Sequence, residues 1–269
     1  MREAVSALGA SCENVSIDAP LQGGSVTIRP GSVVWEGVPL LEAGAILVEA
    51  PVFPWPQPQR IEVAGERDAR SLVLSALSIA ALHVPVWNRP PSAHLAASRA
   101  VALDRLAAAE IRVHPFRLAP APPTGSEGGG VVLDAVGRDR WHRPSRPAAG
   151  EPSLVLDPVA GEVAAVLVAG GAVAGALRHA SALEWAGDAG GTSLAAAAVP
   201  EASARTALAA ARELGLEIAC VAVATATEAV LLVEAGPALE AWDAKLRGVL
   251  APHVAGRLLA AARREWSPP

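Results

Sequence analysis

Residues 163–178 read VAAVLVAGGAVAGALR, two apolar runs on either side of a glycine pair. The runs at 163–168 and 172–177 are each long enough for a strand and contain no charged residue. Glycine adopts the positive φ that a two-residue hairpin turn requires, and Gly170-Gly171 stands between the runs. The stretch therefore predicts a β-hairpin.

The segments after the hairpin contain further helices and strands. Pro200 suits the first turn of a helix and Gly215 its end, so a helix is predicted between them. Apolar runs at 218–223 and 229–233 predict two more strands, antiparallel to each other. The last predicted elements are two helices, which begin at Ala238 and at His253 and are separated by Pro252.

The segments before the hairpin alternate between strand and helix patterns, which is typical of an α/β layer. Strands are predicted at 25–29, 45–49, 84–88 and 111–113, and helices at 69–82 and from Ser92 to beyond Leu106. Between 119 and 130 the composition changes to Pro, Gly, Ser and Thr, which indicates a linker or a mobile loop. We therefore expect two domains, residues 1–118 and 119–269.

Composition excludes several classes of protein. The 269 residues are 52% hydrophobic and 18% charged, which rules out a disordered chain. The net charge of −5 argues against a nucleic-acid partner. Two cysteines supply neither a disulfide framework nor a zinc site. The longest uncharged stretch, of about 15 residues, is too short to span a membrane, and no targeting signal is visible, so a cytoplasmic protein is expected.

Positive charge is concentrated in one place, residues 138–146, with four arginines and a histidine. This basic loop has two readings: a solvated surface loop, or a site that captures an acidic small-molecule substrate or an acidic protein partner.

Four parts of the sequence carry a resemblance to a known family, the first of them made of three short stretches. They are VWNRP with ASR and LDRLAAAEI (86–90, 97–99 and 103–111), the hairpin that ends at Arg178, GGT (190–192), and LGL followed by LLVEAGP (214–216 and 231–237). In order and spacing the chain resembles the RimK-like branch of the ATP-grasp family. The resemblance implies an α/β ATP-grasp-like fold, with an N-terminal α/β lobe, a reduced central subdomain and a C-terminal sheet-and-helix lobe.

The resemblance also implies site residues. Such enzymes use ATP and Mg²⁺ to convert a carboxylate to an acyl phosphate, which an amine then attacks to form an amide. Arg178 matches a catalytic contact to the phosphate or acyl phosphate. Arg99, Gly190, Gly191 and Glu234 match nucleotide-binding positions, and Glu234 also matches a metal ligand.

The chain departs from the family pattern at several of these positions. Lys245 is the only lysine, so neither of the family's two nucleotide lysines is present. Arg99 is the nearest match to the first, and Asp134 stands at the second. The terminal Glu-x-Asn is replaced by residues 234–236, Glu-Ala-Gly, which removes the Asn oxygen ligand. Arginine and lysine are not interchangeable at a tight phosphate site.

Each candidate residue has a structural alternative. Arg99 has polar neighbours on its helix, so the alternative is a solvated helix face. For Glu234 the alternative is a cap or a salt bridge. Arg178 ends an apolar strand, where the alternative is a structural ion pair or a surface position.

These observations lead to two functional hypotheses and leave open whether the chain is an enzyme. The first is a degenerate, non-catalytic relative that binds a partner protein or a small metabolite, with a link to cofactor biosynthesis only by family association. The alternative is an ATP-dependent carboxylate–amine ligase that adds glutamate to a protein or to a pterin- or furan-type cofactor. ATP and Mg²⁺ are the expected cofactors if the site is retained, and none otherwise.

Overall fold

The computed structural model describes residues 2–15, 24–48, 66–120, 130–135, 152–187, 191–236 and 243–263. The basic loop at 138–146 and Gly190 lie outside these residues, so the predictions that concern them stay predictions.

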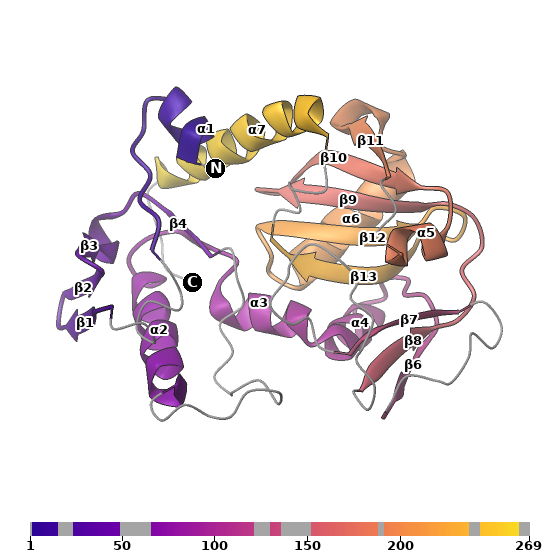
Figure 1. The fold of residues 1–269 in the computed structure, drawn as a ribbon, viewed down its shortest axis with the longest axis horizontal. Coiled ribbons are helices and arrows are strands. Elements are labelled where there is room, and N and C mark those ends of the chain that lie inside the picture. The colour runs from indigo at the N-terminus through magenta and orange to yellow at the C-terminus, as the bar shows by residue number, and fades with distance from the viewer. Residues whose placement is uncertain are drawn as a thin grey trace.

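A five-stranded antiparallel sheet forms the centre of the fold (Figure 1). Its order is β11-β10-β9-β12-β13, and the predicted hairpin is confirmed as β9 and β10. The strands are β9 (Val163–Ala169), β10 (Ala172–His179), β11 (Thr192–Ala195), β12 (Ile218–Ala224) and β13 (Ala229–Ala235).

Helix α6 (Glu201–Glu213) covers one face of this sheet. It contacts β9, β10, β12 and β13, and three buried alanines, Ala207, Ala210 and Ala211, let the helix backbone approach the strands closely. Val168 lines a pocket together with Leu208 of α6, so α6 packs on the face that carries Val168. All seven residues of β9 are buried, which shows that both faces of the sheet centre are covered.

The N-terminal part has a separate small core. It is built mainly from a three-stranded sheet, a helix and the parallel pair β4 with β5, and its buried residues include Val33, Trp35 and Leu77. The helices and strands of the N-terminal part are α1 (Arg2–Ala7), which contacts the last helix, β1 (Val26–Arg29), β2 (Ser32–Trp35), β3 (Val38–Pro39), β4 (Ile46–Leu47), α2 (Glu66–Ala80) and β5 (Val86–Trp87). Val86 belongs to this core and Trp87 to the larger one, because consecutive strand residues point to opposite sides.

A third sheet forms the reduced central subdomain. It contains β6 (Phe116–Ala119), β7 (Val131–Asp134) and β8 (Ser153–Leu156) in the order β6-β8-β7. The short helix α5 (Ala182–Ala186) contacts both β7 and β10. Strand β6 straddles the predicted boundary at 118/119 and pairs with β8, and the division into two domains stays a prediction.

Two helices replace the single one predicted from Ser92. Helix α3 (Pro90–Ala97) begins at a proline in its first turn, and α4 (Arg99–Ala108) follows after a break at Ser98. Both helices contact β13 at the edge of the central sheet.

The last helix is continuous where a break was expected. Helix α7 (Ala244–Ala262) contains Pro252 in its interior, and Asp243 caps its first turn by accepting a hydrogen bond from the Leu246 amide at 2.9 Å. Leu250 and Val254, on either side of the proline, are both buried, and their packing outweighs the cost of the lost backbone hydrogen bond. Within the described residues, no helix is long and apolar enough to cross a membrane.

Asn88 joins the N-terminal part to the central sheet. Its side chain is fully buried and its φ is +55°, a left-handed conformation that asparagine tolerates better than most residues. Its Oδ1 accepts a hydrogen bond from the Ile218 backbone N–H at 3.0 Å, and the backbone N–H of Asn88 donates to Glu217 Oε2 at 2.8 Å. The turn after β5 is thereby fastened to the start of β12.

Candidate functional site

Two of the predicted site residues meet in the structure. A guanidinium nitrogen of Arg99, in the first turn of α4, lies 3.0 Å from Glu234 Oε1 on β13. The side chains are only 2% and 13% exposed, so this is a buried ion pair. Its two members are 135 residues apart in the sequence, and the pair ties α4 to the edge of the central sheet.

The break between α3 and α4 places Arg99 in the interior. Ser98 leaves the helical conformation, with φ −83° and ψ 70°, and Arg99, the first residue of α4, is buried. The other terminal nitrogen of Arg99 donates to the Asp134 backbone oxygen at 2.9 Å, at the end of β7. Arg99 therefore connects α4, β7 and β13. The solvated helix face expected from its polar neighbours is wrong, because those neighbours say nothing about the helix break.

The electrostatics of Glu234 reflect its burial. Removal from water raises the pKa of the Glu234 carboxyl above its ordinary value, and the charge and hydrogen bond of Arg99 oppose that rise. Cys220 pairs with Glu234 across β12 and β13. Burial, and secondarily the charge of Glu234, raise the pKa of the Cys220 thiol to about 12. A thiol in this setting stays protonated and is a poor nucleophile.

Arg178 lies on the other face of the sheet. Glu234 is in register with Cys220, Leu167 and Gly175 across the four strands. Arg178 is three residues beyond Gly175, an odd offset that turns its side chain to the opposite face, and it is exposed. The lateral separation is three strand spacings of about 4.8 Å each. The structure therefore does not bring Arg178 together with Arg99 and Glu234.

His179, which was not selected from the sequence, shares the face of Glu234. It follows Arg178 in β10 and its side chain is buried. Gly191 packs directly on it: a Cβ at Gly191 would lie 2.8 Å from His179 Cε1 and 3.0 Å from the Arg178 carbonyl oxygen. A side chain at position 191 would therefore displace the histidine ring. The alternation of side chains along a strand predicts that Arg178 and His179 point to opposite faces of the sheet. It does not predict which of the two faces Glu234.

In the described part of the chain, the two residues that match nucleotide and metal contacts are engaged with each other. Glu234 directs Oε1 to Arg99, so each charge neutralises the other. Magnesium in a nucleotide site is held by one or two protein carboxylates together with the phosphates, and the carboxylate that the resemblance indicates, Glu234, already contacts Arg99 through Oε1. Lys245 is exposed in the first turn of α7.

Comparisons with known proteins give similarity at the level of structure. No family model matches the chain, and no curated protein matches it. The ATP-grasp ligase PsnB, solved with a phosphomimetic variant of a minimal precursor, Mg and ADP, superposes with a TM-score of 0.70 at 15% identity, over 97% of this chain and 94% of PsnB.

Two further solved structures have the same architecture. The macrocyclase MdnC of Microcystis aeruginosa, bound to the precursor peptide MdnA, has a TM-score of 0.63 at 12% identity and covers 96% of this chain and 94% of its own. A RimK domain ATP-grasp protein of Sphaerobacter thermophilus has a TM-score of 0.56 at 21% identity, with 96% and 93% covered. The expected α/β class is confirmed, and the chain has the ATP-grasp fold.

Proposed function

We propose that this chain is a non-catalytic protein with the ATP-grasp fold that binds a peptide or protein partner. The observation that carries the proposal is the buried pair of Arg99 and Glu234. These are the residues that match nucleotide and metal contacts in the RimK-like pattern, and here each is the partner of the other.

The energetics of the pair favour this function over ligation. Arg99 would have to leave Glu234 before it could contact a phosphate, and an uncompensated buried charge costs about 3–5 kcal/mol. Glu234 would have to leave Arg99 before it could bind Mg²⁺ through Oε1, and Gly236 supplies no side-chain oxygen as a second ligand. The pair acts as a structural link between α4 and β13.

The nature of the partner is supported by the structural neighbours. PsnB was solved with a precursor peptide and AMPPNP, and MdnC with a precursor peptide, so the fold accommodates a peptide as well as a nucleotide. A fold that has lost the nucleotide contacts can still keep a peptide-binding surface. A small metabolite is the other occupant expected from the sequence, and a role beside an active ligase in cofactor biosynthesis rests on family association alone.

Thermal unfolding with and without millimolar Mg-ATP, repeated with Mg-ADP, tests the proposal. A ligand at 100 times its Kd adds about 2.7 kcal/mol to the free energy of unfolding, which for a chain of this size raises Tm by roughly 5–10 °C. We expect no shift. A shift of that order, or release of ADP on addition of glutamate as acceptor, would overturn the proposal in favour of an ATP-dependent carboxylate–amine ligase.

A further inference from the structure

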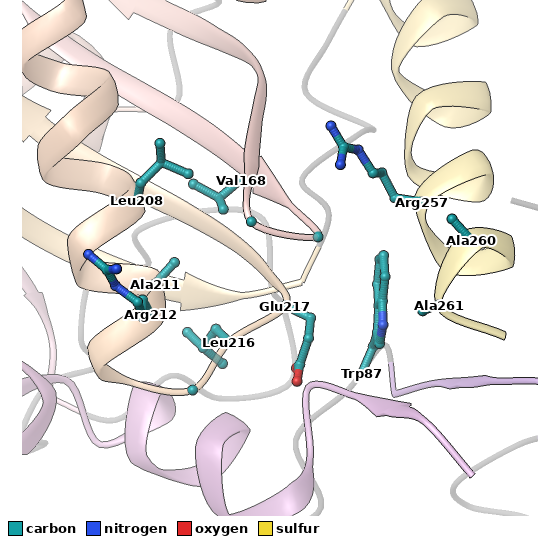
Figure 2. Close-up of a pocket in the computed structure, with 13 residues that line it drawn as sticks. Trp87, Val168, Leu208, Ala211, Arg212, Leu216, Glu217, Arg257, Ala260 and Ala261 are labelled. Carbon is teal, nitrogen blue, oxygen red and sulfur yellow. The ribbon is translucent and has the colours of Figure 1, made fainter. Parts of the chain in front are cut away.

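A cavity lies on the α6 side of the central sheet (Figure 2), and neither Arg99 nor Glu234 lines it. Its volume is about 410 Å³, within the range of pockets that hold small molecules. Figure 2 shows Leu208 and Val168 on one side, and Trp87 with helix α7 on the other. Three separate parts of the chain therefore build it: the strand β5, the central sheet with α6, and α7.

The walls of this cavity are mainly apolar and are held in place by the hairpin turn. The Gly170 amide donates to the Glu217 carbonyl oxygen at 2.7 Å, which fixes the turn against the start of β12. A Cβ at Gly170 would lie 3.2 Å from Trp87 Cη2 and 3.1 Å from Arg257 Cβ. A side chain at residue 170 would therefore crowd Trp87 and Arg257, and the φ of +56° at this position favours glycine. Trp87 is only 5% exposed and is packed in place beside the cavity.

Charge on the rim is predominantly positive. Arg212, in the last turn of α6, and Arg257, on α7, both line the cavity and are exposed. Within the described part of the chain neither guanidinium forms an ion pair. Glu217 also lines the cavity, but its Oε2 accepts a hydrogen bond from the Asn88 backbone N–H and its charge interacts with that of Arg89. The two arginines are therefore the charges left for a ligand.

We propose that this cavity binds a small carboxylic acid with an apolar body, which lies against Trp87 and Leu208 while its carboxylate contacts Arg212 or Arg257. An aromatic or branched aliphatic body of about ten heavy atoms suits the volume and the apolar walls. The guanidinium group is the natural partner of a carboxylate because it offers several donors in one plane. This site is separated by the sheet from Arg99 and Glu234, so it is independent of the proposed function.

The test uses 3-phenylpropionate as the probe and 3-phenylpropan-1-ol as its uncharged analogue, with binding to the full chain measured by calorimetry and ligand-detected NMR. We expect the acid to bind with a Kd of about 1 mM or tighter and the alcohol at least about tenfold more weakly. Absence of binding by the acid, or equal affinities for acid and alcohol, would overturn the proposal.

Substitutions locate the probe. Ala260 lines the cavity from an exposed position on α7, so Ala260→Phe should occupy the space without disturbing the core and should abolish binding. Substitution of the arginine that the carboxylate contacts, by Arg212→Gln or Arg257→Gln, should weaken binding of the acid by about three- to fivefold, and neither substitution should change binding of the alcohol.

The matched controls are Arg205→Gln and Arg247→Gln, which remove the same charge from exposed positions of α6 and α7 that do not line the cavity. Both should bind the acid as the parent chain does. The site would be refuted if a control substitution weakened binding of the acid as much as a cavity substitution does. It would also be refuted if the Ala260→Phe variant had an unchanged Tm and still bound the acid.

Discussion

Replacing Arg99 by methionine removes the charge and the hydrogen bonds of a side chain that is 2% exposed, while it keeps most of the apolar stem. Glu234 then stays buried without its partner, and the Asp134 carbonyl oxygen loses its donor. The converse change, Glu234→Gln, leaves the buried guanidinium without a counter-charge. Each single variant therefore leaves one uncompensated buried charge.

The expected loss of stability follows from that arrangement. Breaking a buried ion pair from one side costs about 3–5 kcal/mol. For a chain of this size each kcal/mol lowers Tm by about 2–4 °C, so either variant should unfold at least about 6 °C below the parent. The double variant Arg99→Met with Glu234→Leu leaves no buried charge, and we expect it to be more stable than either single variant.

The assay is a double-mutant cycle measured by urea unfolding, with a matched control cycle on an exposed pair. Arg105, also on α4, contacts Glu213 at 2.7 Å with side chains 58% and 30% exposed. Its removal by Arg105→Met or Glu213→Gln should cost at most about 1 kcal/mol. The reasoning would be refuted if Arg99→Met cost no more than Arg105→Met, or if the double variant were less stable than both singles.

Three further predictions concern Asn88, Glu217 and Cys220. Asn88→Ala should destabilise the fold by about 2–4 kcal/mol in urea unfolding, because it leaves the Ile218 amide without its acceptor and strains a left-handed residue; a loss under 1 kcal/mol would contradict this. Burial raises the pKa of Glu217 above its ordinary value of 4.5, so its contribution to stability is present below pH 4.5 and is lost as the pH rises through the folded pKa. Glu217→Gln is neutral at every pH and should therefore have a higher Tm than the parent at pH 7.5, and this difference in Tm should shrink as the pH is lowered towards 4.5. A difference in Tm that stays constant between pH 7.5 and 4.5 would be inconsistent with the raised pKa. Iodoacetamide at pH 8 should label Cys12 but not Cys220, whose thiol pKa is about 12, so mass spectrometry should find one label on the native chain and two after denaturation; two labels on the native chain would show that Cys220 is reactive.

Local sequence patterns were sufficient for the main elements. The hairpin with Gly170-Gly171, the helix after Pro200 and the two strands that follow it all lie where the periodicity predicts them. These features depend on short-range terms: turn glycines, a proline in the first helical turn and runs of apolar residues. Continuity of α7 through Pro252 is the exception, because burial on both sides of the proline is a tertiary effect.

The environment of the site residues was not predictable in the same way. Local polarity indicated a solvated Arg99, whereas the helix break at Ser98 and the approach of β13 bury it. The salt bridge considered for Glu234 is present, but nothing in the sequence named its partner. For Arg178 the resemblance implied a phosphate contact but not whether it meets Arg99, and the strand register turns it to the face opposite Glu234.

The sequence by itself determined the α/β class, the hairpin and the order of the elements, because backbone preferences and apolar periodicity act over a few residues. Only the tertiary structure decided that Arg99 and Glu234 neutralise each other across 135 residues, and that Arg178 belongs to another face. Strand β9 is buried on both sides and has no alternating pattern from which a face could be assigned. Which side chains meet is set by the sheet register and by the packing of α4 against β13, and both depend on the whole chain.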